Sequence, residues 1–260
     1  MIVTLLTDFG TADYFVAAMK AVVLGRAPEA RLVDVTHEVP PQDVHAAAFT
    51  LLAVYRDFPP GTVHVAVVDP GVGSARRAVV ASAAGQRFVG PDNGIFSYVL
   101  DREPDARVRH LDDPRWFRHP VSSTFHGRDV FAPVAAALAA GVEPERLGSE
   151  LRDPVRLEPL AARREADGTV RGAVLHVDRF GNCVTTLTPA DLPADAEDSL
   201  RLRVGGREVR GLRRHYAGAR PGEPFAVAGS AGFLEVSVDG ASAARLLGVR
   251  RGDPVELRPA

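Results

Sequence analysis

The chain contains a single cysteine, Cys183, among its 260 residues. A lone cysteine cannot form an internal disulfide and cannot supply the several thiolates of a structural zinc cluster. Charged residues interrupt every apolar stretch before it reaches the roughly 20 residues that a membrane-spanning helix needs. The first residues lack the basic start and long apolar core of a signal peptide, and they are typical of a first β-strand. We therefore expect a cytoplasmic protein that does not bind a membrane.

Concentrated charge of one sign is also missing. The formal net charge is −2, and the basic residues are scattered along the chain rather than gathered in one block. Nucleic acids and anionic membrane surfaces both require a clustered basic surface, so neither is expected as the main partner. Apolar residues make up 46% of the chain. That content allows a sizeable core, in one large domain or in two smaller ones.

Apolar runs alternate with helical patterns in the first 150 residues. This alternation predicts an α/β domain with a mostly parallel central sheet flanked by helices. The predicted strands are 2–6, 31–35 and 63–68, together with a hairpin of 78–82 and 86–89, and the predicted helices are 14–26, 42–57, 93–100 and 129–140.

The pattern changes in the middle of the chain. From about residue 141 to residue 168 the periodicity weakens, and prolines and charged residues become more frequent. We predict an α/β domain over 1–150, a linker over 151–168 and a smaller β-rich, barrel-like domain over 169–260. In this last domain the predicted strands are 173–177, 183–187, 200–204, 225–228 and 233–238, with one helix over 241–247.

Two short motifs in the first domain carry groups suited to catalysis. Asp69 ends an apolar run, and either Arg76 or Arg77 can fold back onto its carboxylate and hold it ionised. His126 lies in a turn just before a predicted helix. A single histidine is more often structural than catalytic, but its place at a helix entrance favours a functional role. Acid, guanidinium and imidazole groups on loops at the ends of core elements are typical of a reaction centre.

Other polar residues lie where α/β proteins bind ligands. Asp8 and Asp13 follow the first predicted strand, whose carboxyl end borders a ligand crevice, although either residue can instead cap the next helix. In the second domain, Phe180 offers a flat ring to a base, and Asn182 has the donor and acceptor that read an adenine edge. Ser230 lies in a Gly-flanked loop that either forms a simple turn or binds a small group.

Taken together, these segments resemble those of the S-adenosyl-L-methionine (SAM) hydrolases, also called SAM hydroxide adenosyltransferases. Fluorinase and chlorinase are relatives of that family. The resemblance covers nearly the whole chain, and the order and spacing of its motifs are highly specific. The motifs are Thr7-Asp8-Phe9-Gly10, Asp34-Val35-Thr36-His37, Asp69-Pro70-Gly71-Val72-Gly73, Gly90-Pro91-Asp92-Asn93-Gly94, Thr124-Phe125-His126-Gly127-Arg128-Asp129 and Phe180-Gly181-Asn182.

The resemblance implies hydrolysis of SAM to adenosine and L-methionine by in-line attack of water at the ribose C5′ carbon, with no metal ion and no other cofactor. It implies an Asp–Arg–His set that handles the water, and Asp69, Arg76 and His126 match this set. Either Asp69 or His126 can accept the proton of the water. The residues implied to bind the substrate are Asp8 at the ribose hydroxyls, Asp13 and Asp178 near the methionine ammonium, Asn93, and Phe180, Asn182 and Ser230 around adenine and the amino-acid end.

Three positions refine this expectation. The halogenating relatives have a serine in place of Gly127 and lack the acid and the imidazole, which favours water over halide as the nucleophile here. Gln42 stands where fluorinase has an aromatic ring, and Ala231 stands where fluorinase has an arginine, so the methionine carboxylate needs another partner. The resemblance also implies a homotrimer, with each site between the large domain of one subunit and the small domain of the next.

Two alternative functions remain open from the residues. One is a metal-dependent phosphohydrolase, in which an oxygen-rich set would bind a divalent ion. The other is a non-catalytic regulatory protein that binds adenosine, although a neutral nucleoside requires neither Arg76 nor His126. The oxygen-rich set of the first alternative consists of Asp8, Asp69, Asp92, Asn93 and His126.

Overall fold

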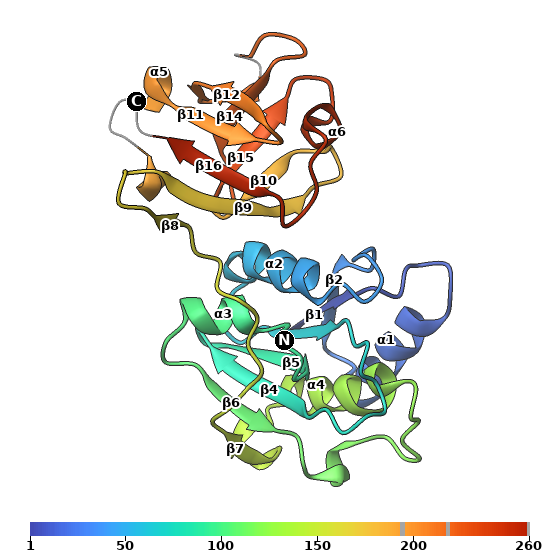
Figure 1. Ribbon diagram of the computed structural model, residues 1–260. Helices are drawn as coiled ribbons and strands as arrows, with labels where there is room; N and C mark the ends of the chain where they lie inside the picture. The colour runs from blue at the N-terminus through green and yellow to red at the C-terminus, as the bar shows by residue number, and fades with distance from the viewer. Residues whose placement is uncertain (193–195, 217–218, 259–260) are drawn as a thin grey trace. The chain divides into compact units, whose positions relative to one another are not determined.

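The computed structural model describes residues 1–192, 196–216 and 219–258 (Figure 1). The chain divides into two compact units, Met1–Pro159 and Leu160–Ala260. The division falls within the region 151–168 that we interpreted as a linker. The two-part fold class predicted from the sequence, α/β followed by a barrel-like β domain, is confirmed.

The sheet of the first unit is mixed rather than mostly parallel. Its strand order in the described residues is β2-β1-β3-β5-β4-β6-β7. The four strands β2, β1, β3 and β5 are parallel, whereas β4, β6 and β7 continue the sheet in antiparallel pairs. The tight β4–β5 hairpin reverses the chain, and a hairpin can only join antiparallel strands. The strand bounds are β1 Ile2–Thr7, β2 Arg31–Thr36, β3 Val63–Val67, β4 Ala78–Ala83, β5 Gln86–Pro91, β6 Arg107–His110 and β7 Ser149–Leu151.

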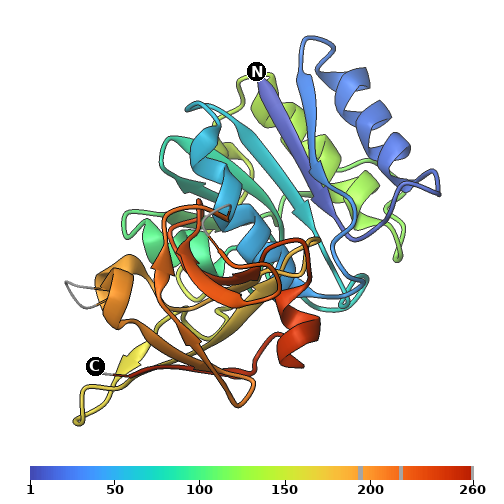
Figure 2. The same ribbon diagram turned by 90° about the horizontal axis from the view of Figure 1, so that it is seen from above.

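Helices cover both faces of this sheet. Figures 1 and 2 show α1 and α4 on one face and α2 and α3 on the other. Every residue of β3 is buried, as expected for a strand between two helical layers. The core beneath α1 and α4 includes Met19, Val23 and Phe131. The helix bounds are α1 Phe15–Arg26, α2 Val44–Val54, η1 Tyr55–Asp57, α3 Ser97–Arg102, η2 Pro114–Trp116, η3 Gly127–Phe131, α4 Ala132–Ala139 and η4 Pro144–Arg146.

Three predicted helices differ from the observed ones in a way that bears on the site. The helix predicted over 42–57 begins only at Val44, because Gln42 has a φ of 66° and Asp43 caps the helix by accepting from the amide of Ala46. The helix predicted over 93–100 begins at Ser97, since the residues before it form a turn. The helix predicted over 129–140 starts as the π-helical turn η3 and continues as α4.

The second unit contains one curled β-sheet with short helices. In the described residues its strands follow the order β12-β11-β16-β9-β10-β15-β14-β13, with β8 also pairing β9. Its core is separate from that of the first unit and includes Cys183, Leu202 and Val236. The elements are β8 Arg163–Arg164, β9 Val170–Val177, β10 Cys183–Thr185, η5 Pro189–Asp191, α5 Ala196–Ser199, β11 Arg201–Val204, β12 Arg207–Arg210, β13 Leu212–Arg213, β14 Pro224–Ala228, β15 Leu234–Val238, α6 Ala243–Leu247 and β16 Pro254–Arg258.

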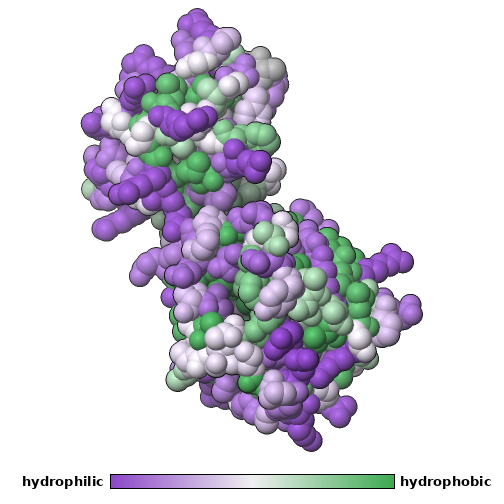
Figure 3. Space-filling model, turned by 90° about the vertical axis from the view of Figure 1, so that its right-hand side faces the viewer, coloured by the Kyte–Doolittle hydropathy of each residue, from purple (hydrophilic) through white to green (hydrophobic). Residues whose placement is uncertain are grey.

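Hydrophilic residues are spread over the faces of both units that Figure 3 shows, and hydrophobic residues form smaller patches among them. Among the described residues, no helix combines the length and the apolar character needed to cross a membrane. The cytoplasmic location stays a prediction.

Candidate active site

The loop after β3 and the loop before η3 meet because of one glycine. Gly73 has a φ of 77°, and a Cβ atom built on it would overlap the carbonyl oxygen of Ser123. Only glycine combines this backbone conformation with such a close approach. The contact brings the segment that carries Asp69 against the segment that carries His126. Two motifs more than 50 residues apart in sequence therefore form one site.

Arg76 joins the acid and the imidazole. Its Nε donates to both carboxylate oxygens of Asp69, at 3.0 and 3.1 Å, and its Nη2 donates to Oδ2 of the same carboxylate. The same Nη2 lies 2.7 Å from Nδ1 of His126. The side chains of Asp69 and Arg76 are only 5% and 11% exposed, so water screens this ion pair weakly. Arg77, the other candidate, turns away and binds Asp92 and Asp153.

The contact with Arg76 sets the protonation of His126. A guanidinium can only donate hydrogen bonds, so Nδ1 of His126 must accept and the ring proton must sit on Nε2. Burial lowers the pKa of His126, the positive charge of Arg76 lowers it further, and the charges of Asp69 and Asp129 oppose this shift only in part. The imidazole is therefore neutral at pH 7 and has one donor, Nε2–H.

A buried carboxylate holds the loop that carries His126. Asp129, whose side chain is fully buried, accepts from the amide of Ser122 at 2.9 Å, from Arg118 at 3.1 Å and from Arg128 at 2.7 Å. Burial alone would raise the pKa of Asp129, but these donors outweigh it and lower the pKa to about 2. Asp129 stays ionised at any physiological pH and fixes both ends of the turn around His126.

Asp69 and His126 face a cavity of about 420 Å³ in the first unit. Asp8 also lines it, and its Oδ2 accepts from the amide of Gln42 at 2.8 Å. Gln42 itself forms part of the cavity wall. Three phenylalanine rings, those of Phe9, Phe15 and Phe125, contribute to the apolar part of the wall. The complete lining is Asp8, Phe9, Phe15, Pro41, Gln42, Val67, Asp69, Pro70, Val72, Thr124, Phe125, His126 and Gly127.

A hydrogen-bonded clamp holds the turn that carries Asp8. The Oγ1 of Thr7 lies 2.9 Å from Nδ1 of the buried His37, and the carbonyl of His37 accepts from the amide of Gly10 at 2.8 Å. On its other side, Nε2 of His37 lies 3.0 Å from Asp34. The Asp34–His37 motif of the sequence therefore fixes the Asp8 turn instead of lining the cavity.

Two expected binding residues of the first unit do not line this cavity. Asn93 uses its amide locally: its Nδ2 donates to the carbonyl of Val68 at 2.8 Å, and its Oδ1 accepts from the amide of Ile95 at 3.2 Å. It thereby ties down the backbone next to Asp69. Asp13 lies exposed in the turn before α1. For both residues, substrate binding stays a prediction.

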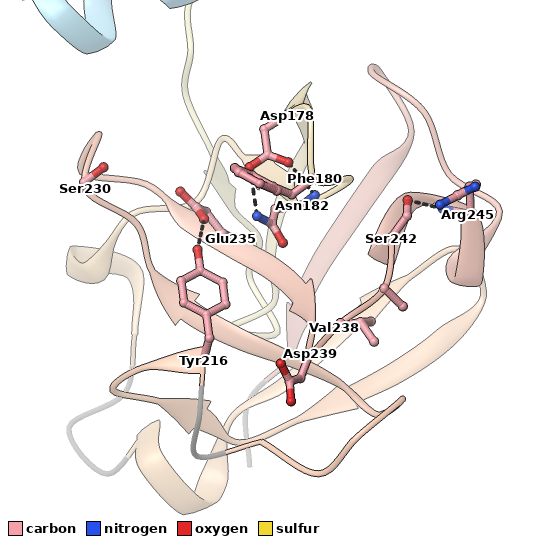
Figure 4. A pocket seen from close by; sticks show the side chains of 12 residues that line it. Asp178, Phe180, Asn182, Tyr216, Ser230, Glu235, Val238, Asp239, Ser242 and Arg245 are labelled. Carbon is pink, nitrogen blue, oxygen red and sulfur yellow. Dashed lines mark hydrogen bonds between the residues drawn. The ribbon is translucent and has the colours of Figure 1, made fainter.

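The second unit has its own cavity, of about 690 Å³, and the four binding residues predicted there all line it (Figure 4). The carboxylate of Asp178 accepts from the amide nitrogen and from Nδ2 of Asn182, both at 2.8 Å. Asn182 is only 7% exposed, whereas Phe180 is 78% exposed. The predicted residues are Asp178, Phe180, Asn182 and Ser230, and further lining residues are Tyr216, Glu235, Val238, Asp239, Gly240, Ala241, Ser242 and Arg245.

Sequence reasoning missed Glu235 and Tyr216 in this cavity. Tyr216 Oη donates to Oε2 of Glu235 at 3.1 Å. A signal for Glu235 was present, since it is the one charged residue of the otherwise apolar or small run Leu234–Val238. Tyr216 has no comparable signal, because it lies in an irregular segment.

The oxygen-rich set proposed for a metal site is not assembled. Asp92 binds Arg77 and the amide of Val155, while Asn93 and His126 have the partners given above. Within residues 1–192, 196–216 and 219–258, no three His, Cys, Asp or Glu side chains are grouped as metal ligands would be.

Comparisons with known proteins identify the family of this chain. Residues 3–148 match the SAM hydroxide adenosyltransferase N-terminal domain, and residues 172–256 match the C-terminal domain. An (R)-S-adenosyl-L-methionine hydrolase of Thermus thermophilus is 44% identical over 262 residues, which cover 97% of each chain. A second such hydrolase, from Salinispora arenicola, is 43% identical over 96% of this chain and 95% of its own.

A crystal structure of an uncharacterized conserved protein from Thermotoga maritima has the same fold, with a TM-score of 0.92 and 38% identity over 99% of this chain and 100% of that chain. The family match spans both units. The chain belongs to the SAM hydroxide adenosyltransferase family.

Proposed function

We propose that this protein hydrolyses SAM to adenosine and L-methionine, and that Asp69, Arg76 and His126 direct the attacking water. The observation that carries the proposal is the buried Asp69–Arg76–His126 cluster at the wall of a cavity that also contains Asp8. A buried acid and a neutral imidazole that share one arginine can hold a water molecule in a fixed direction. The family membership and the SAM hydrolase relatives support this activity.

The proposed reaction requires the protein mainly to position the attacking water and to accept its proton. The water oxygen attacks C5′, the C5′–S bond breaks, and its electron pair stays on sulfur as the neutral thioether of methionine. Such a leaving group needs no general acid. Holding the water in line with the C5′–S bond supplies the largest part of the catalysis, with an upper bound of roughly 7–11 kcal/mol for ideal positioning.

The tautomer of His126 supports Asp69 as the proton acceptor. With Nδ1 accepting from Arg76, the ring offers only Nε2–H to the cavity, so His126 orients the water by donating to its oxygen. The proton that leaves the water then goes to the carboxylate of Asp69, and from there to solvent. Arg76 is the positioning residue, because it fixes the direction of both groups.

We further propose that Asp8 holds the ribose hydroxyls and that Asp178, Phe180, Asn182 and Ser230 bind the adenine and amino-acid parts. The flat, exposed ring of Phe180 beside a buried amide suits a purine base. Asp8 belongs to the first unit, whereas the other four residues belong to the second. On the family resemblance, the proposal also includes a homotrimer in which subunits complete one another's sites. Light scattering should then give a mass of about three times 27.7 kDa.

The test is incubation of the pure protein with SAM in H₂¹⁸O and EDTA, followed by mass spectrometry. Adenosine labelled at its 5′-hydroxyl, together with unlabelled methionine, supports direct displacement by water without a metal ion. Unlabelled adenosine would exclude attack at C5′. Loss of activity in EDTA that a divalent ion restores would favour the phosphohydrolase alternative, and adenosine binding without SAM consumption would favour the regulatory one.

A further inference from the structure

Glu235 is an ionisable group in the cavity of the second unit that the proposed reaction does not use. It lies on β15, and Figure 4 shows its carboxylate turned into the cavity beside Asp178. Tyr216 holds one carboxylate oxygen, Oε2, at 3.1 Å. The other oxygen lies over Gly229, where a Cβ atom would overlap it. The side chain is therefore held in place, and Oε1 has no hydrogen-bond donor among the described residues.

The charges around Glu235 are not balanced. Glu235 interacts with Tyr216 and Asp178, and among the described residues no ion pair joins it or Asp178 to an arginine, lysine or histidine. Arg245 also lines the cavity, but Figure 4 shows it on the opposite side from Glu235. Burial raises the pKa of the Glu235 carboxyl, the Tyr216 hydrogen bond offsets part of this shift, and the charge of Asp178 raises it further. Two carboxylates that repel each other in a half-buried cavity leave a place for a cation.

The rest of the cavity indicates what kind of cation fits. The exposed ring of Phe180 and the nearly buried Asn182 suit a planar, polar base. The ligand must therefore combine a flat base with a positive group that can donate hydrogen bonds. In SAM, the α-ammonium has three N–H donors, whereas the sulfonium has none and the adenine amino group is neutral.

We propose that Glu235 is a specificity-determining residue that binds the α-ammonium group of SAM together with Asp178. This inference rests on the proposed function, since it takes SAM as the ligand. Asp178 is held on one side by Asn182, and Glu235 by Tyr216. The ammonium bridges the two carboxylates and relieves their repulsion. Tyr216 is a positioning residue, because it acts on the ligand through Glu235.

The experiment compares two ligands that the enzyme cannot hydrolyse, because neither has a sulfonium leaving group. S-adenosylhomocysteine carries the α-ammonium, and 5′-methylthioadenosine lacks the amino-acid part. Calorimetry gives their dissociation constants for the wild type and for Glu235→Gln. The variant should bind S-adenosylhomocysteine about 10- to 100-fold more weakly, as expected for a lost charge-assisted hydrogen bond, and should bind 5′-methylthioadenosine unchanged.

Two further variants sharpen the result. Tyr216→Phe should weaken S-adenosylhomocysteine binding by a smaller factor, again without an effect on 5′-methylthioadenosine. Glu223→Gln removes one negative charge of the same unit outside the cavity, and it should change neither dissociation constant. For SAM hydrolysis, Glu235→Gln should raise KM by a similar 10- to 100-fold and leave kcat nearly unchanged.

Equal weakening of both ligands by Glu235→Gln would overturn the inference, because the residue would then act on the nucleoside or on the fold. Unchanged binding of both ligands would overturn it as well. The outcome is separate from that of the proposed function. A wild type that does not hydrolyse SAM refutes the proposed function, while selective loss of S-adenosylhomocysteine binding still supports the role of Glu235.

Discussion

His64 should make the protein acid-sensitive well above the range in which carboxylates titrate. It lies fully buried on β3, the strand that leads to Asp69. Its Nε2 donates to Oε1 of Gln86 at 3.2 Å, its Nδ1 accepts from the hydroxyl of Thr4 at 2.8 Å, and its ring stacks on Phe88. The neutral ring is thus fully satisfied, and a charged ring would lie in the core of the sheet.

The size of the effect follows from the pKa of His64. Burial lowers this pKa from 6.5 to about 4, and the hydrogen bond to Gln86 opposes the shift without cancelling it. The unfolded chain therefore binds one more proton than the folded chain between those two values. The free energy of unfolding is at its full value above pH 6.5 and falls as the pH drops toward 4, by about 2 kcal/mol at pH 5 and about 3 kcal/mol at pH 4.

The assay is urea unfolding followed by circular dichroism at pH 7, 6, 5 and 4, on the wild type and on His64→Gln. Glutamine keeps a hydrogen-bond donor and an acceptor but does not titrate. The variant therefore lacks the pH-dependent contribution of His64 to stability and keeps those of the other titratable groups. From pH 7 to pH 5, the free energy of unfolding of the wild type should fall by about 2 kcal/mol relative to that of His64→Gln. A difference that stays constant over this range would refute the reasoning.

Three other predictions concern the site. Asp69→Asn should lower kcat for SAM by about 10²- to 10⁴-fold, as for loss of a positioned base, while calorimetry shows unchanged S-adenosylhomocysteine binding; a wild-type rate would contradict the role of Asp69. The pH profile of kcat/KM should stay flat down to pH 6.5 and fall only below it, because burial and Arg76 lower the pKa of His126; a midpoint above 6.5 would contradict the neutral ring. Gly73→Ala should lower the unfolding free energy by about 1–3 kcal/mol through backbone strain, and it should also lower kcat, because the clash with Ser123 separates Asp69 from His126. Unfolding and turnover assays on the same sample would check both effects, and unchanged turnover would show that this contact does not align the two groups.

The sequence predicted local structure well where the apolar pattern was long. The strands of the parallel half of the sheet, the β4–β5 hairpin and α1 lie within about two residues of their predicted positions. It did not anticipate β6 and β7, which are short, partly exposed and flanked by prolines and charges. The sheet was therefore expected to be mostly parallel, although its second half is antiparallel. Short edge strands give little periodic signal, because only a few of their residues are buried.

Motif order and spacing in the sequence identified the family, and the family match confirms that identification. The residue types alone also indicated an acid, an arginine and an imidazole. They did not distinguish Arg76 from Arg77, and they left the proton acceptor open. Only the fold places Arg76 between Asp69 and His126 while Arg77 binds Asp92. Which nitrogen of His126 bears the proton depends on that contact, because a hydrogen bond requires the two atoms to lie close together in the folded protein.

In the second unit, too, the sequence predicted some binding residues and only the fold identified others. The residue types of Phe180 and Asn182 and their place in a turn predicted that they bind a ligand. The proposed role of Glu235 depends instead on the residues that surround it in the folded protein. Its raised pKa comes from burial and from Asp178, a residue 57 positions earlier in the chain. Sequence determined which chemical groups this protein has and the order in which they occur. Tertiary structure decided which of them lie within hydrogen-bond distance and away from water, because both conditions depend on how the strands and loops pack.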